Sequence, residues 1–92
     1  MAAPPKPKVI FAIYGGLRDG NKIEVKIVTK ALQKAINDKL GEKVQINNDT
    51  MGGDPAKLVP KQFAALVEVK PGKPESRRFF ASEEDQVIDF TP

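Results

Sequence analysis

The spacing of hydrophobic residues changes abruptly after Val28, and this change constrains the fold more than any other feature of the sequence. From Lys22 onward, apolar and charged residues alternate, as in a strand with one buried face. The two sides of that strand carry Ile23, Val25 and Ile27 against Lys22, Glu24 and Lys26. Apolar residues then recur every four positions, which is typical of a helix face, at Val28, Leu32, Ile36 and Leu40. With Thr29 placed to cap it and Gly41 to end it, we predict a helix of about ten residues over 30–40.

Other segments of the chain have the composition of strands. Residues 8–14 are β-branched and aromatic with apolar side chains on both faces, so we expect a strand that is buried on both sides and ended by Gly15-Gly16. Turn-forming residues separate the remaining candidates. Those candidates are Glu42–Asn47, Lys61–Lys70, Glu75–Ala81 and Gln86–Phe90. Pro71-Gly72 predicts a tight turn between the fourth and the fifth of the six candidates, because proline presets φ and glycine supplies a positive φ.

Six strands and one helix joined by short connections favour a mainly β fold. We predict an antiparallel β-sandwich with the helix covering one opening or edge. The alternative is an α+β fold with the helix packed on one antiparallel sheet. Residues 1–7 contain three prolines and are expected to form a flexible arm, with residues 8–92 making a single β-rich domain.

The composition argues against several classes of catalyst. The chain has no cysteine and no histidine, so thiol catalysis and the commonest neutral-pH general base are excluded. Serine occurs only at 76 and 82, with no histidine to activate it. The adjacent carboxylates of Glu83, Glu84 and Asp85 are read as a solubilising turn. We expect a protein that is not an enzyme and needs no cofactor and no metal.

A polar central stretch holds the first candidate binding site. Asn47, Asn48, Asp49 and Asp54 offer oxygen atoms within eight residues, beside Gly52-Gly53. Such side chains can bind calcium or hydrogen-bond to sugar hydroxyls, but they equally often fold back on their own backbone, and we favour this last role. We also predict that Met51 is buried and anchors the loop, because an exposed loop tip seldom keeps a large apolar side chain.

The distribution of charge suggests a second candidate, a nucleic-acid surface. Residues 1–43 carry nine basic and four acidic side chains, whereas residues 44–92 carry six basic and eight acidic ones. The side chains of this candidate belong to types that contact phosphates and bases. They are Lys30, Gln33, Lys34 and Asn37 on the helix, with Arg77 and Arg78 beside Phe79-Phe80. A solvated surface of mixed charge is the plainer interpretation.

Several short motifs follow one another in an order that resembles a known module. They are Tyr14-Gly15-Gly16, Val28-Thr29 with Leu32-Gln33, Asn47-Asn48, Gly53-Asp54-Pro55, Lys61 and Glu83-Glu84. This order resembles the small β-rich module at the C-terminus of DnaJ-like C11 proteins, over roughly residues 8–90. Ile27 stands where the pattern has an aspartate, and the glycine between Pro55 and Lys61 is missing. The resemblance implies an accessory or interaction domain and no activity.

These observations lead to one functional expectation and one alternative. We expect a non-enzymatic binding or interaction module that recognises carbohydrate or a protein partner through its loops. The alternative is a nucleic-acid-binding domain that uses its basic N-terminal half. The N-terminal residues have no apolar core typical of a signal peptide and no apolar run has membrane-spanning length, so we expect a cytoplasmic protein without a membrane partner.

Overall fold

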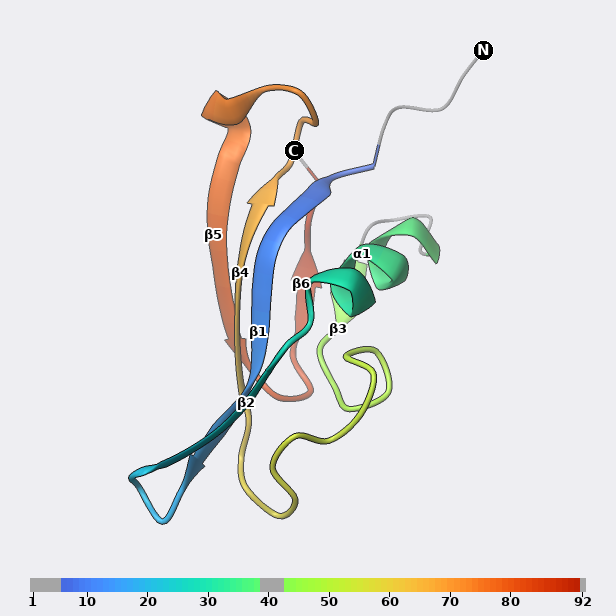
Figure 1. The fold of residues 1–92 in the computed structure, drawn as a ribbon. Coiled ribbons are helices and arrows are strands. Elements are labelled where there is room, and N and C mark those ends of the chain that lie inside the picture. Colours follow the sequence, from blue (N-terminus) through green and yellow to red (C-terminus); the bar gives the residue numbers. More distant parts are fainter. Residues whose placement is uncertain (1–5, 39–42, 92) are drawn as a thin grey trace.

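In the computed structural model, which describes residues 6–38 and 43–91, four strands form an antiparallel sheet in the order β2-β1-β4-β5. A second antiparallel sheet pairs β3 with β6, and α1 lies near it (Figure 1). The elements are β1 (Lys8–Arg18), β2 (Lys22–Ile27), α1 (Thr29–Asp38), β3 (Lys43–Gln45), β4 (Gln62–Glu68), a 3-10 turn η1 (Pro74–Ser76), β5 (Arg77–Glu83) and β6 (Val87–Asp89). The prediction of a mainly β fold with two antiparallel layers of strands and one short helix is confirmed.

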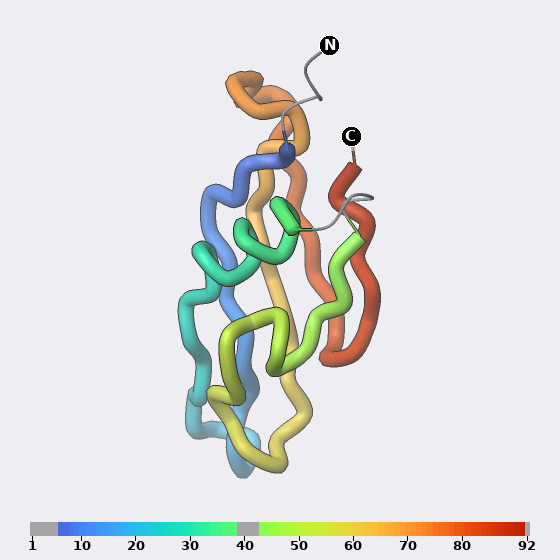
Figure 2. The backbone as a smooth tube through the Cα atoms, turned by 90° about the vertical axis from the view of Figure 1, so that its right-hand side faces the viewer, coloured from blue at the N-terminus to red at the C-terminus, as the bar shows by residue number. Residues whose placement is uncertain are grey.

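The core lies on one side of the four-stranded sheet only. Figure 2 shows α1 and the central loop (residues 46–61, between β3 and β4) in front of that sheet, with β3 and β6 beside them. The buried side chains of this layer meet those of the sheet. The largest are Tyr14, Leu32, Ile36, Ile46, Met51, Phe63, Val67 and Phe90. Met51 is fully buried within the central loop, as predicted.

Strand β1 runs further than expected. Gly15-Gly16 does not end it; the strand continues to Arg18 and pairs with β2 along this length. Both glycines are required by close approach of other backbone segments. A Cβ atom at Gly15 would lie 2.2 Å from the carbonyl oxygen of Glu24, and one at Gly16 would lie 2.6 Å from that of Pro60. The expectation that β1 is buried on both sides is also wrong, because its outward-pointing side chains reach solvent.

Helix α1 docks as its four-residue spacing predicts. Val28, Leu32 and Ile36 are buried against the strands, while Leu40 and the predicted C-cap Gly41 lie outside the described residues. The predicted cap is wrong: Thr29 is the first helical residue, and its hydroxyl accepts a hydrogen bond from the backbone N–H of Ala12, at 3.1 Å. The N–H of Val28 also donates to the carbonyl oxygen of Ala12, at 2.9 Å. Together these two hydrogen bonds tie the start of α1 to β1.

The β4–β5 hairpin follows the predicted turn, with a positive φ of 86° at Gly72. The returning strand begins at Arg77 and not at Glu75, because Pro74–Ser76 form the 3-10 turn first. On β5, Phe80 points into the core and packs on Phe90 with ring centroids 4.7 Å apart. Phe79 points the other way and is exposed.

The predicted N-terminal arm is partly described. Pro7 is buried, and its carbonyl accepts a hydrogen bond from the side-chain amide of Gln33 at 2.9 Å. The first five residues of the arm lie outside the described residues.

Candidate functional site

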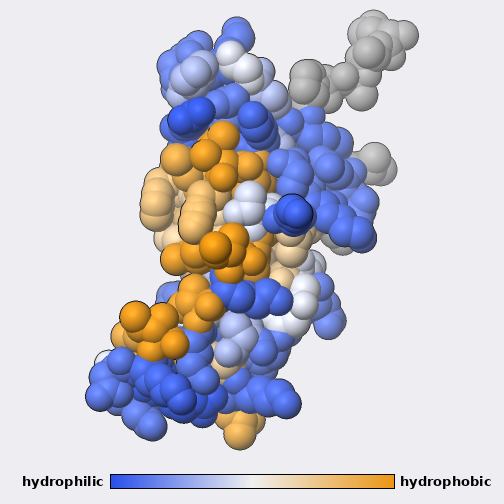
Figure 3. Space-filling model, viewed as in Figure 1, coloured by the Kyte–Doolittle hydropathy of each residue, from blue (hydrophilic) through white to orange (hydrophobic). Residues whose placement is uncertain are grey.

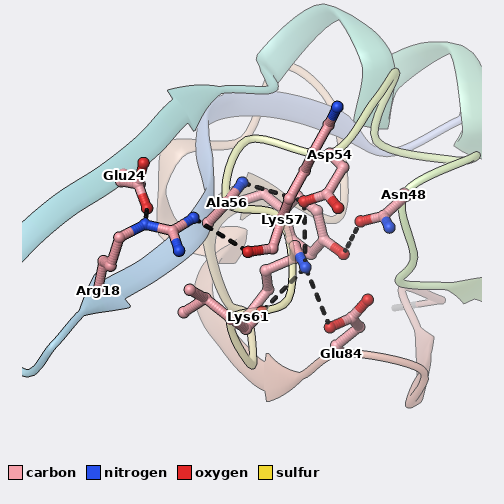
Figure 4. A network of polar contacts seen from close by, with 10 residues as sticks. Arg18, Glu24, Asn48, Asp54, Ala56, Lys57, Lys61 and Glu84 are labelled. Atoms are coloured by element: carbon pink, nitrogen blue, oxygen red, sulfur yellow. Dashed lines mark hydrogen bonds and ion pairs between the residues drawn. The ribbon is translucent and has the colours of Figure 1, made fainter.

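Residues of five of the six motifs in the sequence resemblance meet in one polar network beneath the central loop (Figure 4). The sixth motif, at the start of α1, contacts β1 and Pro7 instead. Strand β1 points Tyr14 into the core, where its hydroxyl donates to the Oδ1 atom of Asn48 at 2.8 Å. Burial raises the pKa of the Tyr14 phenol well above its ordinary value, and the carboxylates of Glu84 and Asp54 raise it further. The phenol therefore stays neutral and acts as a hydrogen-bond donor that holds the loop.

Lys61 lies at the centre of the same network with only 4% of its surface exposed. Its Nζ atom donates to the carbonyl oxygen of Val59 at 2.9 Å, and forms ion pairs with Asp54 at 3.0 Å and Glu84 at 3.7 Å. A buried ammonium must be paired in this way because its desolvation is costly. The three contacts join the central loop to the turn between β5 and β6.

Asp54 is also fixed by the loop backbone. Its Oδ1 atom accepts a hydrogen bond from the N–H of Ala56 at 3.0 Å. Desolvation acts to raise the pKa of Asp54, but the hydrogen bonds from Lys61 and Ala56 outweigh it, so the pKa lies below the ordinary value. Asp54 is thus a charged structural ligand of Lys61.

The remaining predicted loop residues divide into occupied and displayed side chains. The Asn47 Oδ1 atom accepts from the N–H of Thr50 at 2.9 Å, and the Thr50 hydroxyl accepts in turn from the N–H of Asn47 at 3.1 Å. Asn48 is bonded to Tyr14, as described above. Asp49 is exposed on the outside of the turn. The loop therefore places the four predicted residues close together, but uses Asn47, Asn48 and Asp54 for its own structure.

A groove between α1 and the central loop borders Asp49. It has a volume of about 400 Å³ and is lined by Lys34, Asp38, Asp49, Thr50 and Gly52, with Ala31 and Ala35. Lys34 and Asp38 form an ion pair across one helical turn, at 3.2 Å, on this exposed surface. The side chain of Asp49 is exposed to solvent beside this groove.

The helix side chains predicted to contact nucleic acid have different roles. Lys30, Lys34 and Asn37 are exposed. Gln33 is a structural bridge: its Oε1 atom accepts from the N–H of Val9 at 2.7 Å, and its Nε2 atom donates to the carbonyl of Pro7 at 2.9 Å. Gln33 therefore fixes the start of β1 against α1.

The arginines of β5 do not join that helix surface as a pair. Arg77 points to the face of the sheet that lies away from α1, where its Nε atom contacts the Glu68 carboxylate at 3.0 Å. This contact and the N–H of Gly72 keep the pKa of Glu68 below its ordinary value. Arg78, the next residue along the strand, points to the opposite face and is exposed. The predicted basic set is thus divided between two sides of the sheet.

A second candidate site, which the sequence interpretation missed, is the uncovered face of the four-stranded sheet. Most outward-pointing side chains of its four strands are apolar, and the polar ones of β4 and β5 stand at the strand ends: Gln62, Glu68, Arg77 and Glu83. We call this surface the open face, and it comprises Phe11, Ile13, Leu17, Ile23, Val25, Ile27, Ala64, Leu66, Phe79 and Ala81. Figure 3 shows apolar side chains gathered over the strands from the upper third of the molecule down towards the β1–β2 hairpin. Exposed fractions reach 73% for Ile23, 70% for Ile27 and 72% for Phe79.

Strand β2 reverses the orientation expected of a surface strand. Its alternation is present as predicted, but the expectation that its apolar face is buried is wrong. Ile23, Val25 and Ile27 are exposed on the open face, whereas Glu24 and Lys26 are partly buried on the covered side. Glu24 is held there by an ion pair with Arg18. A strand that served only to cover a core would place these two sets of side chains the other way round.

The open face is hollowed in two places. One hollow of about 450 Å³ lies near the hairpin end, between Ile13, Leu17 and Val25 on one side and Val59 and Pro60 on the other. A second, of about 260 Å³, lies at the centre of the face. It is lined by Phe11, Ala12, Ile13, Ala64, Ala65, Leu66 and Phe79. Both hollows are lined mainly by apolar side chains, so they suit aliphatic or aromatic side chains of a partner.

Comparison of the chain with protein-family models, with curated proteins and with solved structures gives no match. The resemblance to the module of DnaJ-like C11 proteins therefore stays a prediction from the sequence. Within the part of the chain that the structure describes, no group of three His, Cys, Asp or Glu side chains is placed to hold a metal ion. Across residues 6–38 and 43–91, no helix has the length and apolar character needed to span a membrane.

Proposed function

We propose that this chain is a non-enzymatic interaction module that binds a protein surface through the open face of its four-stranded sheet. The observation that carries the proposal is the exposure of Ile23, Ile27 and Phe79 on one continuous apolar surface. Exposing a large aliphatic or aromatic side chain to water costs about 1.5–3 kcal/mol relative to burying it. Contiguous apolar patches of this kind mark interaction sites.

The orientation of β2 supports this choice over a chance exposure. Its partly buried Glu24 and Lys26 would be solvated more easily on the open face, and its isoleucines would be shielded more easily on the covered one. The strand therefore carries a cost in the isolated chain that a bound partner would remove. This argument favours the sheet face over the loops as the contact surface.

The hydrogen bonds within the central loop also favour the sheet face as the contact surface. Three of its four predicted ligand residues already form hydrogen bonds or ion pairs within the chain. Binding through them would require breaking bonds that fix the loop. The non-enzymatic part of the proposal is supported by the pairing of Lys61, whose buried Nζ atom is held between the carboxylates of Asp54 and Glu84.

The proposal is tested by placing a photo-reactive phenylalanine analogue at position 79 and identifying its crosslinked adducts in the cell that naturally makes the protein. Val87 on β6 provides the matched control, because it is an exposed apolar strand residue (61%) outside the open face. We expect protein adducts from position 79 and none from position 87. Absence of adducts from both positions, or equal adducts from both, would overturn the proposal.

A parallel titration tests the nucleic-acid alternative. Binding through phosphate contacts weakens steeply as salt rises, whereas contacts between apolar faces do not. A labelled oligonucleotide is titrated with the purified chain at low and high salt. We expect no binding at either; salt-sensitive micromolar binding that is lost in Lys30→Gln and Lys34→Gln variants would contradict the proposal.

A further inference from the structure

We propose that the open face binds a second copy of this chain, with the two sheets stacked face to face and their strands antiparallel. This inference rests on the proposed function, since it names the occupant of the same surface. It follows from the arrangement of large, small and charged side chains on β4 and β5, which is complementary to itself under a two-fold rotation.

Two neighbouring rows of residues that pair across the strands of the open face differ in the size of their side chains. The first, here the Phe row, aligns Phe11, Leu66 and Phe79 across β1, β4 and β5. The second, here the alanine row, aligns Ile13, Ala64 and Ala81 across the same strands. The central hollow of about 260 Å³ lies where the rows meet, because residues of both rows line it. The face therefore presents a ridge beside a depression.

A two-fold axis perpendicular to the strands brings ridge and depression together. Between the two rows lies a third set of registered positions, Ala12, Ala65 and Phe80, whose side chains point into the core. An axis over these positions places the Phe row of each copy on the alanine row of the other. Leu66 and Phe79 then meet Ala64 and Ala81, while on β1 Phe11 meets Ile13. Closed, isologous pairing of this kind is the commonest arrangement of soluble homo-oligomers, and interlocking large and small side chains is how stacked sheets pack.

The charges at the two ends of β5 fit the same axis. Arg77 lies two residues before Phe79, and Glu83 lies two residues after Ala81, so both are equally far from Phe80. Both side chains point to the open face, since they alternate with Phe80. The rotation sets Arg77 of each copy, which already contacts Glu68 of its own chain, against Glu83 of the other. Each Arg77 then lies between two carboxylates, which gives two intermolecular ion pairs at the rim. A parallel stacking of β5 on β5 would instead bring like charges together.

The size of the face fits a reversible dimer. The rotation overlays three strands, β1, β4 and β5, spaced about 4.8 Å apart, and seven residues of each at about 3.3 Å give a flat area of roughly 330 Å² on each copy. Side-chain relief adds to this area, whereas the apolar residues of β2 extend past the partner and stay exposed. The total for two copies stays below about 1,200 Å², the lower end of standard interfaces, so we expect a weak dimer that dissociates in the upper micromolar range.

Sedimentation velocity across the micromolar range tests the inference. We expect the wild-type chain to pass from monomer to dimer as its concentration rises. Phe79→Glu should weaken the dimer at least about tenfold, as central aromatic residues of interfaces do, while Val87→Glu should leave it unchanged. Circular dichroism of both variants checks that they fold. A wild-type chain that stays monomeric throughout, or equal effects of the two substitutions, would overturn the inference.

Charge reversal tests the antiparallel arrangement itself. Arg77→Glu places two glutamates together at each rim contact and Glu83→Arg places two arginines together, so each variant alone should dimerise more weakly. Arg77→Glu also removes the intrachain partner of Glu68, so circular dichroism first checks that this variant folds. Mixed in equal amounts, the two variants should form a heterodimer that recovers wild-type affinity, because every rim contact then joins opposite charges. No recovery in the mixture would contradict the antiparallel two-fold.

The photo-reactive side chain at position 79 separates failure of this inference from failure of the proposed function. Adducts with twice the mass of the chain are expected if the partner is a second copy. If position 79 gives only adducts with other proteins, the open face is an interaction surface and the dimer is wrong. If it gives no adduct and the chain is monomeric, both are wrong.

Discussion

Removing the side chain of Met51 should destabilise the domain strongly, although this residue lies in a loop. Met51 has no exposed surface and belongs to the same hydrophobic core as the strands and α1. Its backbone N–H donates to the carbonyl of Asn47 at 3.0 Å, so the residue also sits within the hydrogen-bonded turn of the loop. Met51→Ala therefore leaves a cavity at the junction of loop and core.

The expected loss in the free energy of unfolding follows from what substitutions of buried residues cost in general. Replacing a buried Leu, Ile or Met by Ala costs about 2–5 kcal/mol, with the lower half of this range where the surroundings can collapse. A loop collapses more readily than a strand, so we expect about 2–3.5 kcal/mol. In a domain of this size each 1 kcal/mol lowers the melting temperature by about 4–8 °C, which predicts a fall of roughly 10–25 °C.

Leu58→Ala is the matched control. Leu58 is a large apolar residue of the same loop, but it is fully exposed. Its substitution should change the free energy of unfolding by less than about 0.5 kcal/mol. Urea denaturation measures both variants, and an unchanged slope shows that only stability has changed. If Met51→Ala unfolds within the error of Leu58→Ala, the role of Met51 as an anchor is refuted.

Further predictions concern the polar network and the close backbone approach in β1. Because Tyr14 is the only tyrosine and the chain has no tryptophan, ultraviolet absorbance reports this phenol alone. Its raised pKa means that its contribution to stability is complete below the unfolded value of about 10 and is lost as pH rises toward the folded value; absorbance that titrates near 10 while circular dichroism stays native would contradict this. Lys61→Met should cost about 1–3 kcal/mol in urea denaturation, because it leaves two carboxylates without their cation. The lowered pKa of Asp54 means that its contribution is complete above the unfolded value and is lost as pH falls through the folded value; the variant should therefore lose less stability on acidification than the wild type, and equal losses would disprove the coupling. Gly15→Ala should cost at least about 3 kcal/mol, because its Cβ would collide with backbone atoms of β2, while Gly20→Ala at an open turn position should cost about 1 kcal/mol; equal thermal melts of the two would refute the argument.

The helix and the alternating strands were predictable because their signals are local. The four-residue spacing of Val28, Leu32 and Ile36 identifies one face of a helix wherever that helix packs. The burial of Met51 was predictable for a similar reason, since a turn rich in polar residues rarely exposes a long apolar side chain. Each of these inferences needs only a few consecutive residues and their chemistry.

The direction of the β2 alternation was not predictable from the same kind of pattern. Alternation shows that Ile23, Val25 and Ile27 share a face, but it cannot show whether that face meets the core of the chain or remains open. Sequence reasoning assigned it to the core because burial within one chain is the default. The charged residues opposite them, which are partly buried in the structure, give no local sign of that burial.

Contacts between distant segments explain the other errors. Gly15 and Gly16 resemble a strand terminator, yet they are needed because β2 and Pro60 approach them closely. The hydroxyl of Thr29 has a capping position in the sequence, yet it bonds to Ala12 on a neighbouring strand. The ion pairs of Lys61 join residues up to 23 positions away, as far as Glu84. Most of these contacts join residues too far apart for a short stretch of sequence to contain both partners.

The position of β4 in the middle of the sheet has a consequence for how the chain folds. β1 pairs with β4 from Lys8–Glu68 to Gly15–Gln62, so the central ladder closes a loop of some fifty to sixty residues. High contact order of this kind slows folding to the millisecond-to-second range. During synthesis, the β1–β2 hairpin and α1 leave the ribosome well before β4 does. Throughout that interval one edge of β1 has no partner strand. A nascent chain whose synthesis pauses at this stage is therefore most exposed to strand pairing with other nascent chains on the same messenger RNA.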